Sequence, residues 1–176
     1  MRAEAPASPD ARRREQVLEV LRGVLDPEVP AVSVVDLGIV RDVELDAAGV
    51  PTVVVTPTYS GCPAVKVIEE AIVEALQAHG FAGASVRTVF APAWTTDWMS
   101  DEGREKLRRY GIAPPGRRAA SEESELVPLT RRVARVDCPF CGSTKTTMRS
   151  DFGSTACKAL MYCDACRQPF ELFKAI

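Results

Sequence analysis

The sequence has a single histidine, His79, and contains no glycine-rich phosphate loop or dinucleotide fingerprint. With one histidine, the sequence shows neither a catalytic cysteine–histidine pair nor a serine–histidine–aspartate triad. No window approaches the roughly 18 consecutive apolar residues of a membrane-spanning helix. The first ten residues contain Glu4 and no apolar run, so they predict neither a signal peptide nor an amphipathic transit helix. These absences argue against a self-contained enzyme, and we expect no membrane partner.

The bulk composition is that of a globular protein, with 46% hydrophobic and 26% charged residues among 176. This length suffices for one ordinary domain plus a small second module. Because no secretion signal is predicted, we expect a cytoplasmic location, where thiols meet a reducing environment. Paired cysteines in that environment are more often metal ligands or redox groups than disulfides.

Two cysteine pairs near the C-terminus carry the clearest motif. Cys138 and Cys141 form the first pair, Cys163 and Cys166 the second, and 21 residues separate the pairs. Two closely spaced thiolates on each of two turns supply the four sulfur ligands of a structural zinc ion. The alternatives at this point are a disulfide or unrelated buried cysteines. Cys157 is a fifth thiol in the same region, and we interpret it as the spare one.

Charge is distributed unevenly along the chain. Residues 1–130 carry 14 basic and 20 acidic side chains, whereas residues 131–176 carry 8 and 4. Four excess positive charges favour contact with phosphate or an acidic partner, but they are too few to define a nucleic-acid footprint. Nucleic acid therefore stays a minority interpretation.

Apolar periodicity predicts an α+β domain over residues 11–115, after a disordered tail at residues 1–10. Helical spacing covers residues 11–25, and Asp26-Pro27 ends it. A β-hairpin follows at residues 40–56. A second helix begins at Cys62-Pro63 and ends near Gly80, and a third strand covers residues 85–90. The order helix, strand, strand, helix, strand predicts one sheet covered by helices.

The rest of the chain divides into a short helix, a linker and a small β-rich module. Ser100 is placed to cap a helix over residues 100–110. Residues 116–132 change to a composition rich in Pro, Gly, Ser, Glu and Arg, which predicts a linker. Residues 133–176 contain the cysteine pairs among short β-like runs. So small a module depends on metal ligation for much of its folding free energy.

Cys62 and Asp26 are the candidate functional residues outside the zinc motif. Cys62 lies between a strand end and a helix start, where backbone amides stabilise a thiolate and lower its pKa. A small packed core residue is an equal interpretation. Asp26 is expected at the same end of the sheet and could share a metal with the thiol. Its structural alternative is simply to end the first helix.

Several ordered motifs resemble those of a known family. The N-terminal ones resemble the metal-sulfur cluster assembly domain of the MIP18 type: LDPE at 25–28, DLGIV at 36–40 and TPTYSGCP at 56–63. The later ones resemble the PaaD family, a component of the bacterial phenylacetyl-CoA epoxidase system: WTTDW at 94–98, GIAPP at 111–115, FGSTACKAL at 152–160 and PFELFK at 169–174. Together they cover nearly the whole chain after residue 11.

This resemblance implies an accessory role in aerobic phenylacetate degradation. The epoxidase system of that family uses a di-iron oxygenase and a flavin and iron-sulfur reductase, and those components are the implied partners. The family's metal-handling cysteine falls on Cys62, and the acidic residue of its first motif falls on Asp26. The implied cofactors are a structural zinc and a transiently held iron or iron-sulfur cluster. The chain itself lacks the carboxylate and histidine set of a di-iron site.

Three functional classes remain open from the sequence. A maturation factor would bind labile iron or a cluster at Cys62. A structural oxygenase subunit would copurify stably with its partners. A zinc-ribbon nucleic-acid binder would show salt-sensitive affinity carried by the C-terminal module. The motifs favour the first class.

Overall fold

A computed structural model describes residues 8–59, 61, 63–116 and 136–174. The chain divides into two compact units, residues 1–94 and residues 95–176. The fold is α+β, as predicted, with a helix-covered sheet in the first unit and a β-rich second unit. Within the described residues, no helix is long and apolar enough to cross a membrane.

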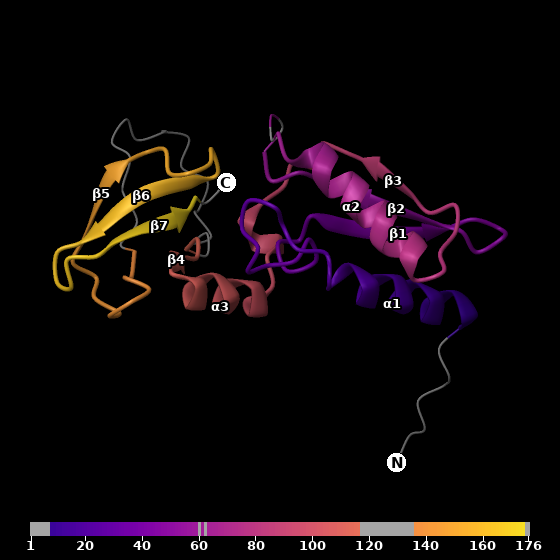
Figure 1. Ribbon diagram of the computed structural model, residues 1–176, viewed down its shortest axis with the longest axis horizontal. Coiled ribbons are helices and arrows are strands. Elements are labelled where there is room, and N and C mark those ends of the chain that lie inside the picture. Colours follow the sequence, from indigo (N-terminus) through magenta and orange to yellow (C-terminus); the bar gives the residue numbers. More distant parts are fainter. Residues whose placement is uncertain (1–7, 60, 62, 117–135, 175–176) are drawn as a thin grey trace, which may run out of the picture. The chain divides into compact units, whose positions relative to one another are not determined.

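The first unit is a three-stranded sheet with two helices against it. Its elements follow the predicted order: α1 (Pro9–Leu21), β1 (Val40–Leu45), β2 (Pro51–Val55), α2 (Val65–Ala78) and β3 (Ser85–Thr88). The strand order is β1-β2-β3, with β1 antiparallel and β3 parallel to β2. Figure 1 shows α2 lying along the sheet between α1 and β3.

Apolar side chains on one face of each helix meet the sheet. The helices bury Val17 and Leu21 from α1 and Ile68, Ile72 and Leu76 from α2. Each side chain removed from water in this way contributes roughly 1.5–3 kcal/mol of hydrophobic stabilisation. The two helices are therefore fixed over the sheet by the periodic apolar positions that predicted them.

The ends of both helices differ from the prediction. Helix α1 begins at Pro9, inside the expected tail, because the Ser8 hydroxyl accepts a hydrogen bond from the Ala11 amide and proline suits the first turn. It ends at Leu21, ahead of Asp26. Helix α2 begins at Val65, later than the predicted start, and His79 forms its C-cap, next to the predicted end near Gly80.

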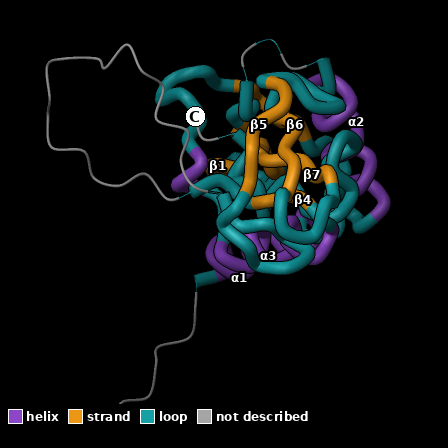
Figure 2. The backbone as a smooth tube through the Cα atoms, turned by 90° about the vertical axis from the view of Figure 1, so that its left-hand side faces the viewer, coloured by secondary structure: helices purple, strands orange, loops and turns teal. Residues whose placement is uncertain are grey.

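The second unit joins a short helical segment to a four-stranded sheet. It contains a 3₁₀ turn (Thr96–Trp98), α3 (Asp101–Tyr110), β4 (Ile112–Ala113), β5 (Thr146–Ser150), β6 (Lys158–Cys163) and β7 (Pro169–Phe173). The strand order is β4-β7-β6-β5, and Figure 2 shows these strands side by side. As predicted, Ser100 caps α3: its hydroxyl accepts from the Gly103 amide at 2.9 Å.

The boundary predicted at residue 115 differs from the observed division after Trp94. Ile112 and Ala113 of β4 pair in parallel with Glu171 and Leu172 of β7, so β4 belongs to the sheet of the cysteine module and α3 to the same unit. Two residues are too short a strand for periodicity to reveal, which is why the sequence pattern placed this segment with the first domain. The predicted linker, apart from Gly116, lies outside the described residues.

Candidate functional site

The four cysteines of the two predicted pairs converge at one end of the second unit. Their sulfur atoms all lie within 4.8 Å of one another. Two of the separations are 3.7 Å, between Cys138 and Cys166, and 3.6 Å, between Cys141 and Cys163. Sulfurs bound tetrahedrally at about 2.3 Å from one zinc ion would be roughly 3.8 Å apart. The arrangement therefore fits a single four-coordinate ion.

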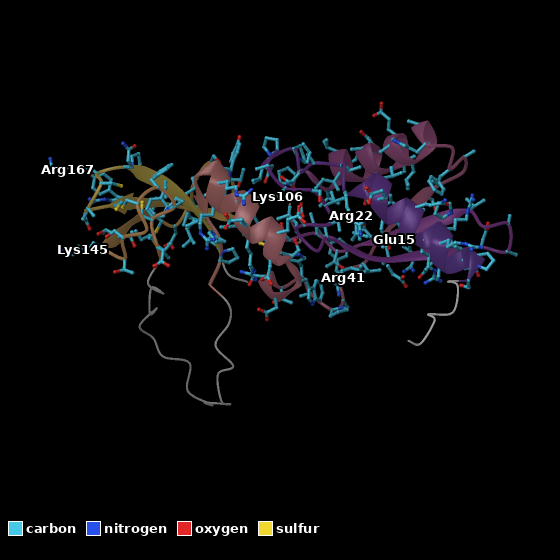
Figure 3. All side chains as sticks on the ribbon, turned by 90° about the horizontal axis from the view of Figure 1, so that it is seen from below. Glu15, Arg22, Arg41, Lys106, Lys145 and Arg167 are labelled. Atoms are coloured by element: carbon cyan, nitrogen blue, oxygen red, sulfur yellow. The ribbon has the colours of Figure 1, made fainter. Side chains whose placement is uncertain are left out.

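Two similar turns present these sulfurs. In the first, the Gly142 amide donates to the Cys138 carbonyl, and in the second the Arg167 amide donates to the Cys163 carbonyl. Both turns require a left-handed residue: φ is 70° at Gly142 and 61° at Arg167. Glycine adopts this conformation freely, whereas arginine carries a steric cost. Figure 3 shows Arg167 and Lys145 at the end of the unit where the sulfur atoms gather.

Electrostatics within the cluster differ from one thiol to the next. Hydrogen bonds from the backbone amides of Cys166 and Ala165 lower the pKa of Cys163 to about 7. Burial raises the pKa of Cys166 to about 12, and the neighbouring thiols add to that rise. A cation at the centre would favour the thiolate form at all four positions, since metal binding displaces thiol protons.

Cys157 lies outside this cluster and is buried beside Thr155, with 3.1 Å between its sulfur and the threonine hydroxyl. The turn that carries it is anchored to β7. Glu171 accepts from the Ser154 amide and pairs with the buried ammonium of Lys158 at 3.1 Å. The structure thus gives Cys157 a packed position in the second unit, away from the four converging sulfurs.

A second candidate site lies at one end of the sheet in the first unit, where several loops meet. Strand β1 begins there and β2 ends there, and the Thr56 amide donates to the Ile39 carbonyl between them. The Val34 amide donates to the Val24 carbonyl, which folds the preceding loop onto itself. The indole of Trp94 donates to the Leu37 carbonyl at 3.0 Å and brings the segment after β3 to the same loop.

Asp26 occupies this loop as a buried carboxylate, 8% exposed. One of its oxygens accepts from the amides of Glu28 and Val29, both at 2.8 Å. These bonds organise the turn after Pro27, so Asp26 shapes the loop and does not cap the end of α1. Whether it also ligates a metal stays a prediction.

Two further polar residues at this sheet end were not singled out by the sequence. Asp36 is 7% exposed and accepts from both the amide and the hydroxyl of Ser33 at 2.9 Å. Thr56 is 2% exposed, and its buried hydroxyl has no hydrogen-bond partner among the residues described. An unpaired buried hydroxyl costs about 1–3 kcal/mol, so its presence calls for an explanation. The available signal was that Thr56 opens the motif ending in Cys62 and Pro63.

Cys62 itself lies outside the described residues, so its predicted place at a helix start stays a prediction. The structure describes Gly61 before it and Pro63 after it, and both precede α2. The chain that leaves β2 at Thr56 and enters α2 at Val65 therefore starts from the sheet end that contains Asp26 and Asp36.

Comparison with known proteins finds one family for a part of each unit. Residues 14–89 match the family model described as iron-sulfur cluster assembly protein, and residues 122–174 match that of the PaaD zinc beta ribbon domain. A crystal structure of a DUF59 domain of unknown function from Bacillus anthracis superposes with a TM-score of 0.52 at 28% identity, covering 55% of this chain and 92% of that one. Fold and site thus define the class, a DUF59-like domain followed by a zinc ribbon.

Two curated relatives refine this assignment. The D-type component of the putative 1,2-phenylacetyl-CoA epoxidase of Escherichia coli K12 is 46% identical over 161 residues, 92% of each chain. An Fe-S protein maturation auxiliary factor of Porphyromonas gingivalis is 37% identical over 94 residues, which cover 53% of this chain and 89% of the relative. The chain belongs to the PaaD family of phenylacetyl-CoA epoxidase components.

Proposed function

We propose that this protein is an accessory factor that assists the maturation of iron or iron-sulfur centres in the other components of a phenylacetyl-CoA epoxidase system. The observation that carries the proposal is the sheet end of the first unit. Loops there place two buried carboxylates, and a Thr56 hydroxyl without a partner among the described residues, where the segment containing Cys62 begins. The family model for iron-sulfur cluster assembly matches residues 14–89, a relative named for Fe-S protein maturation matches about half of the chain, and the relative named for the epoxidase matches nearly all of it.

In this proposal iron, or an iron-sulfur cluster, is cargo. Cys62 supplies the thiolate that handles it, and Asp26 shapes or completes the site. The partners are the iron-sulfur reductase and the di-iron oxygenase components, because those subunits contain the centres to be matured. The protein would act in the cytoplasm, where the thiol stays reduced.

The second unit has a structural task in the same proposal. Cys138, Cys141, Cys163 and Cys166 bind one zinc ion, which supplies the free energy that the small sheet cannot gain from burial alone. The fit of four sulfurs to one tetrahedral ion supports this assignment.

Substitution of Cys62 by alanine tests the proposal. In a strain that lacks the native protein, Cys62→Ala should fold and keep its zinc but fail to support active epoxidase. The partner subunits purified from that strain should contain less iron and sulfide than those matured with the wild type. Cys157→Ser is the matched control and should support activity normally.

Two results would contradict the proposal. Full complementation by Cys62→Ala would leave the thiol without a functional role. A structural oxygenase subunit would instead be indicated if the protein copurified stably and stoichiometrically with its partners, and if those partners were fully metallated with either the wild type or Cys62→Ala.

A further inference from the structure

Strand β3 forms an edge of the sheet in the described part of the first unit. Its pairing with β2 is parallel, and the Val89 amide donates to the Val55 carbonyl just beyond its end. Backbone N–H and C=O groups alternate in direction along a strand, so those of Ser85 and Arg87 point toward β2. The N–H and C=O groups of Val86 and Thr88 consequently point away from the sheet and form an open row.

A groove of about 560 Å³ runs between this edge and helix α2. Its apolar part consists of Val73 from the helix together with Ala84 and Val86 at the strand. Figure 1 shows that α2 has one side toward β3 and the opposite side toward α1. A strand added to β3 would rest its inward-facing side chains against the side of the helix toward β3.

The helix side of the groove is acidic. Glu69, Glu70 and Glu74 line it, and no lysine or arginine is among the lining residues. Glu69 accepts a hydrogen bond from the Thr88 hydroxyl, whereas Glu70 and Glu74 make no ion pair with any residue the structure describes. Two carboxylates are thus available at the rim for basic side chains of an incoming segment.

The four-residue edge strand β3 carries no lysine, proline or bulge that would block pairing. Natural sheets block open edges with lysine, proline or bulges. The basic residue of β3, Arg87, forms an ion pair with Glu44 of β1, so its charge is directed across the sheet. The β-bulge of this sheet lies in β1, between Val40 and Asp42, and leaves β3 regular.

We propose that the β3 edge and the acidic face of α2 together dock an extended basic segment of a partner protein by strand addition. The open backbone groups provide the affinity, and the glutamates select a segment with lysine or arginine on the helix side. A second copy of this chain is disfavoured as occupant, because pairing of two β3 edges would bring like-charged glutamates together. The inference does not depend on the metal-handling role of Cys62.

To test this, the zinc-loaded full chain is titrated with an acetylated, amidated peptide of sequence Thr-Lys-Val-Lys-Val-Lys-Thr. NMR signals of the protein's backbone amides report the binding. We expect saturable binding, with slowed hydrogen exchange at Val86 and Thr88. The same peptide with alternate backbone nitrogens methylated keeps its charge but loses its donors. It should bind at least about tenfold more weakly, a factor equivalent to about 1.4 kcal/mol.

Charge reversal provides the matched pair of variants. Glu70→Lys/Glu74→Lys should weaken peptide binding at least about tenfold, and Glu70→Gln/Glu74→Gln should weaken it less. Glu15→Lys/Glu19→Lys makes the same change in net charge on α1, where both residues pair with Arg22, and should bind the peptide normally (Figure 3).

Each of five results would overturn the inference. The first four are no binding at millimolar peptide, equal binding of the methylated peptide, equal loss of binding in the α1 control, and amide protection confined to another surface. A dimer in sedimentation experiments that protects Val86 and Thr88 would assign the edge to a second copy and would overturn it as well.

Discussion

At the scale of single residues, Thr56 carries a buried hydroxyl, unpaired among the described residues, at the sheet end where we propose the functional site. Its hydroxyl is buried and has no partner among the residues described, although threonine and valine have nearly the same shape. A residue that lowers stability at a loop-lined sheet end is typical of a binding site, where the missing partner arrives with the ligand.

We expect Thr56→Val to raise the free energy of unfolding of the first unit by about 1 kcal/mol, because the substitution removes an unsatisfied polar group. The same variant should lose the ability to mature the partner subunits. Urea unfolding and the complementation assay measure the two effects.

Thr96→Val is the matched control, since Thr96 also has a buried hydroxyl with no partner in the described part of the chain but belongs to the second unit. It should stabilise that unit by a similar amount and leave function unchanged. A loss of stability in Thr56→Val would indicate a hydrogen bond that the hydroxyl makes in solution, and retained function would remove Thr56 from the site.

At the scale of elements, strands β6 and β7 are linked by the ion pair of Lys158 and Glu171. The lysine side chain is 4% exposed and the glutamate 24%. Burial acts to raise the pKa of Glu171, but hydrogen bonds from Ser154 and the charge of Lys158 outweigh it and lower that pKa below its usual value. The pair also positions the turn that carries Cys157.

Lys158→Met should destabilise the second unit by about 2 kcal/mol, since it leaves a partly buried carboxylate without its cation. The pKa of Glu171 is lower in the folded than in the unfolded chain. The stability that its ionised carboxylate contributes is therefore fully present above the unfolded pKa, and it is lost only as the pH falls through the folded pKa. Denaturant titrations should therefore show the same loss of stability in Lys158→Met at every pH between about 6 and 8.

A neutral partner provides the control for this ion pair. Lys158→Met/Glu171→Gln should recover most of the lost stability, because the amide keeps an acceptor for Ser154 without a buried charge. Arg22→Ala, which breaks an exposed pair with Glu19, should cost less than about 1 kcal/mol. Equal effects of the two single substitutions would show that burial of Lys158 contributes nothing.

At the scale of the whole molecule, the two units should respond separately to loss of metal. Residues 95–113 belong to the unit of the four cysteines, and β4 pairs with β7. Chelation of zinc, or Cys163→Ser, should thus unfold α3 and β4 together with the ribbon strands. The amides of α1 and α2 should keep their protection from hydrogen exchange, and metal analysis should find the zinc lost.

Truncation tests the same division from the other side. A fragment of residues 1–94 should unfold cooperatively, because it retains both helices and all three strands of the first sheet. A fragment of residues 1–115 should have the same midpoint, with α3 amides unprotected because β7 is missing. A clearly higher midpoint for the longer fragment would return residues 95–115 to the first domain.

Local patterns in the sequence were enough to predict the helix–strand order, the Ser100 cap and the convergence of the four cysteines. The first two depend on residues close along the chain, namely the apolar spacing of a helix face and a hydroxyl three residues before its amide. The cysteine site was predicted from two short chelating loops, although the loops themselves meet over 22 to 28 residues. The family resemblance also came from contiguous motifs. The helix starts shifted by a few residues, as expected where caps compete.

Only the tertiary structure decided where the units divide, that the buried Thr56 hydroxyl has no partner among the described residues, and that β3 leaves an open edge beside acidic residues of α2. Each of these features depends on segments distant in sequence. Ile112 pairs with Glu171 across most of the second unit, and Glu70 and Val86 line one groove only once the helix is packed on the sheet. Periodicity reports which face of an element is buried, but the partner that buries it is set by the packing of the whole chain.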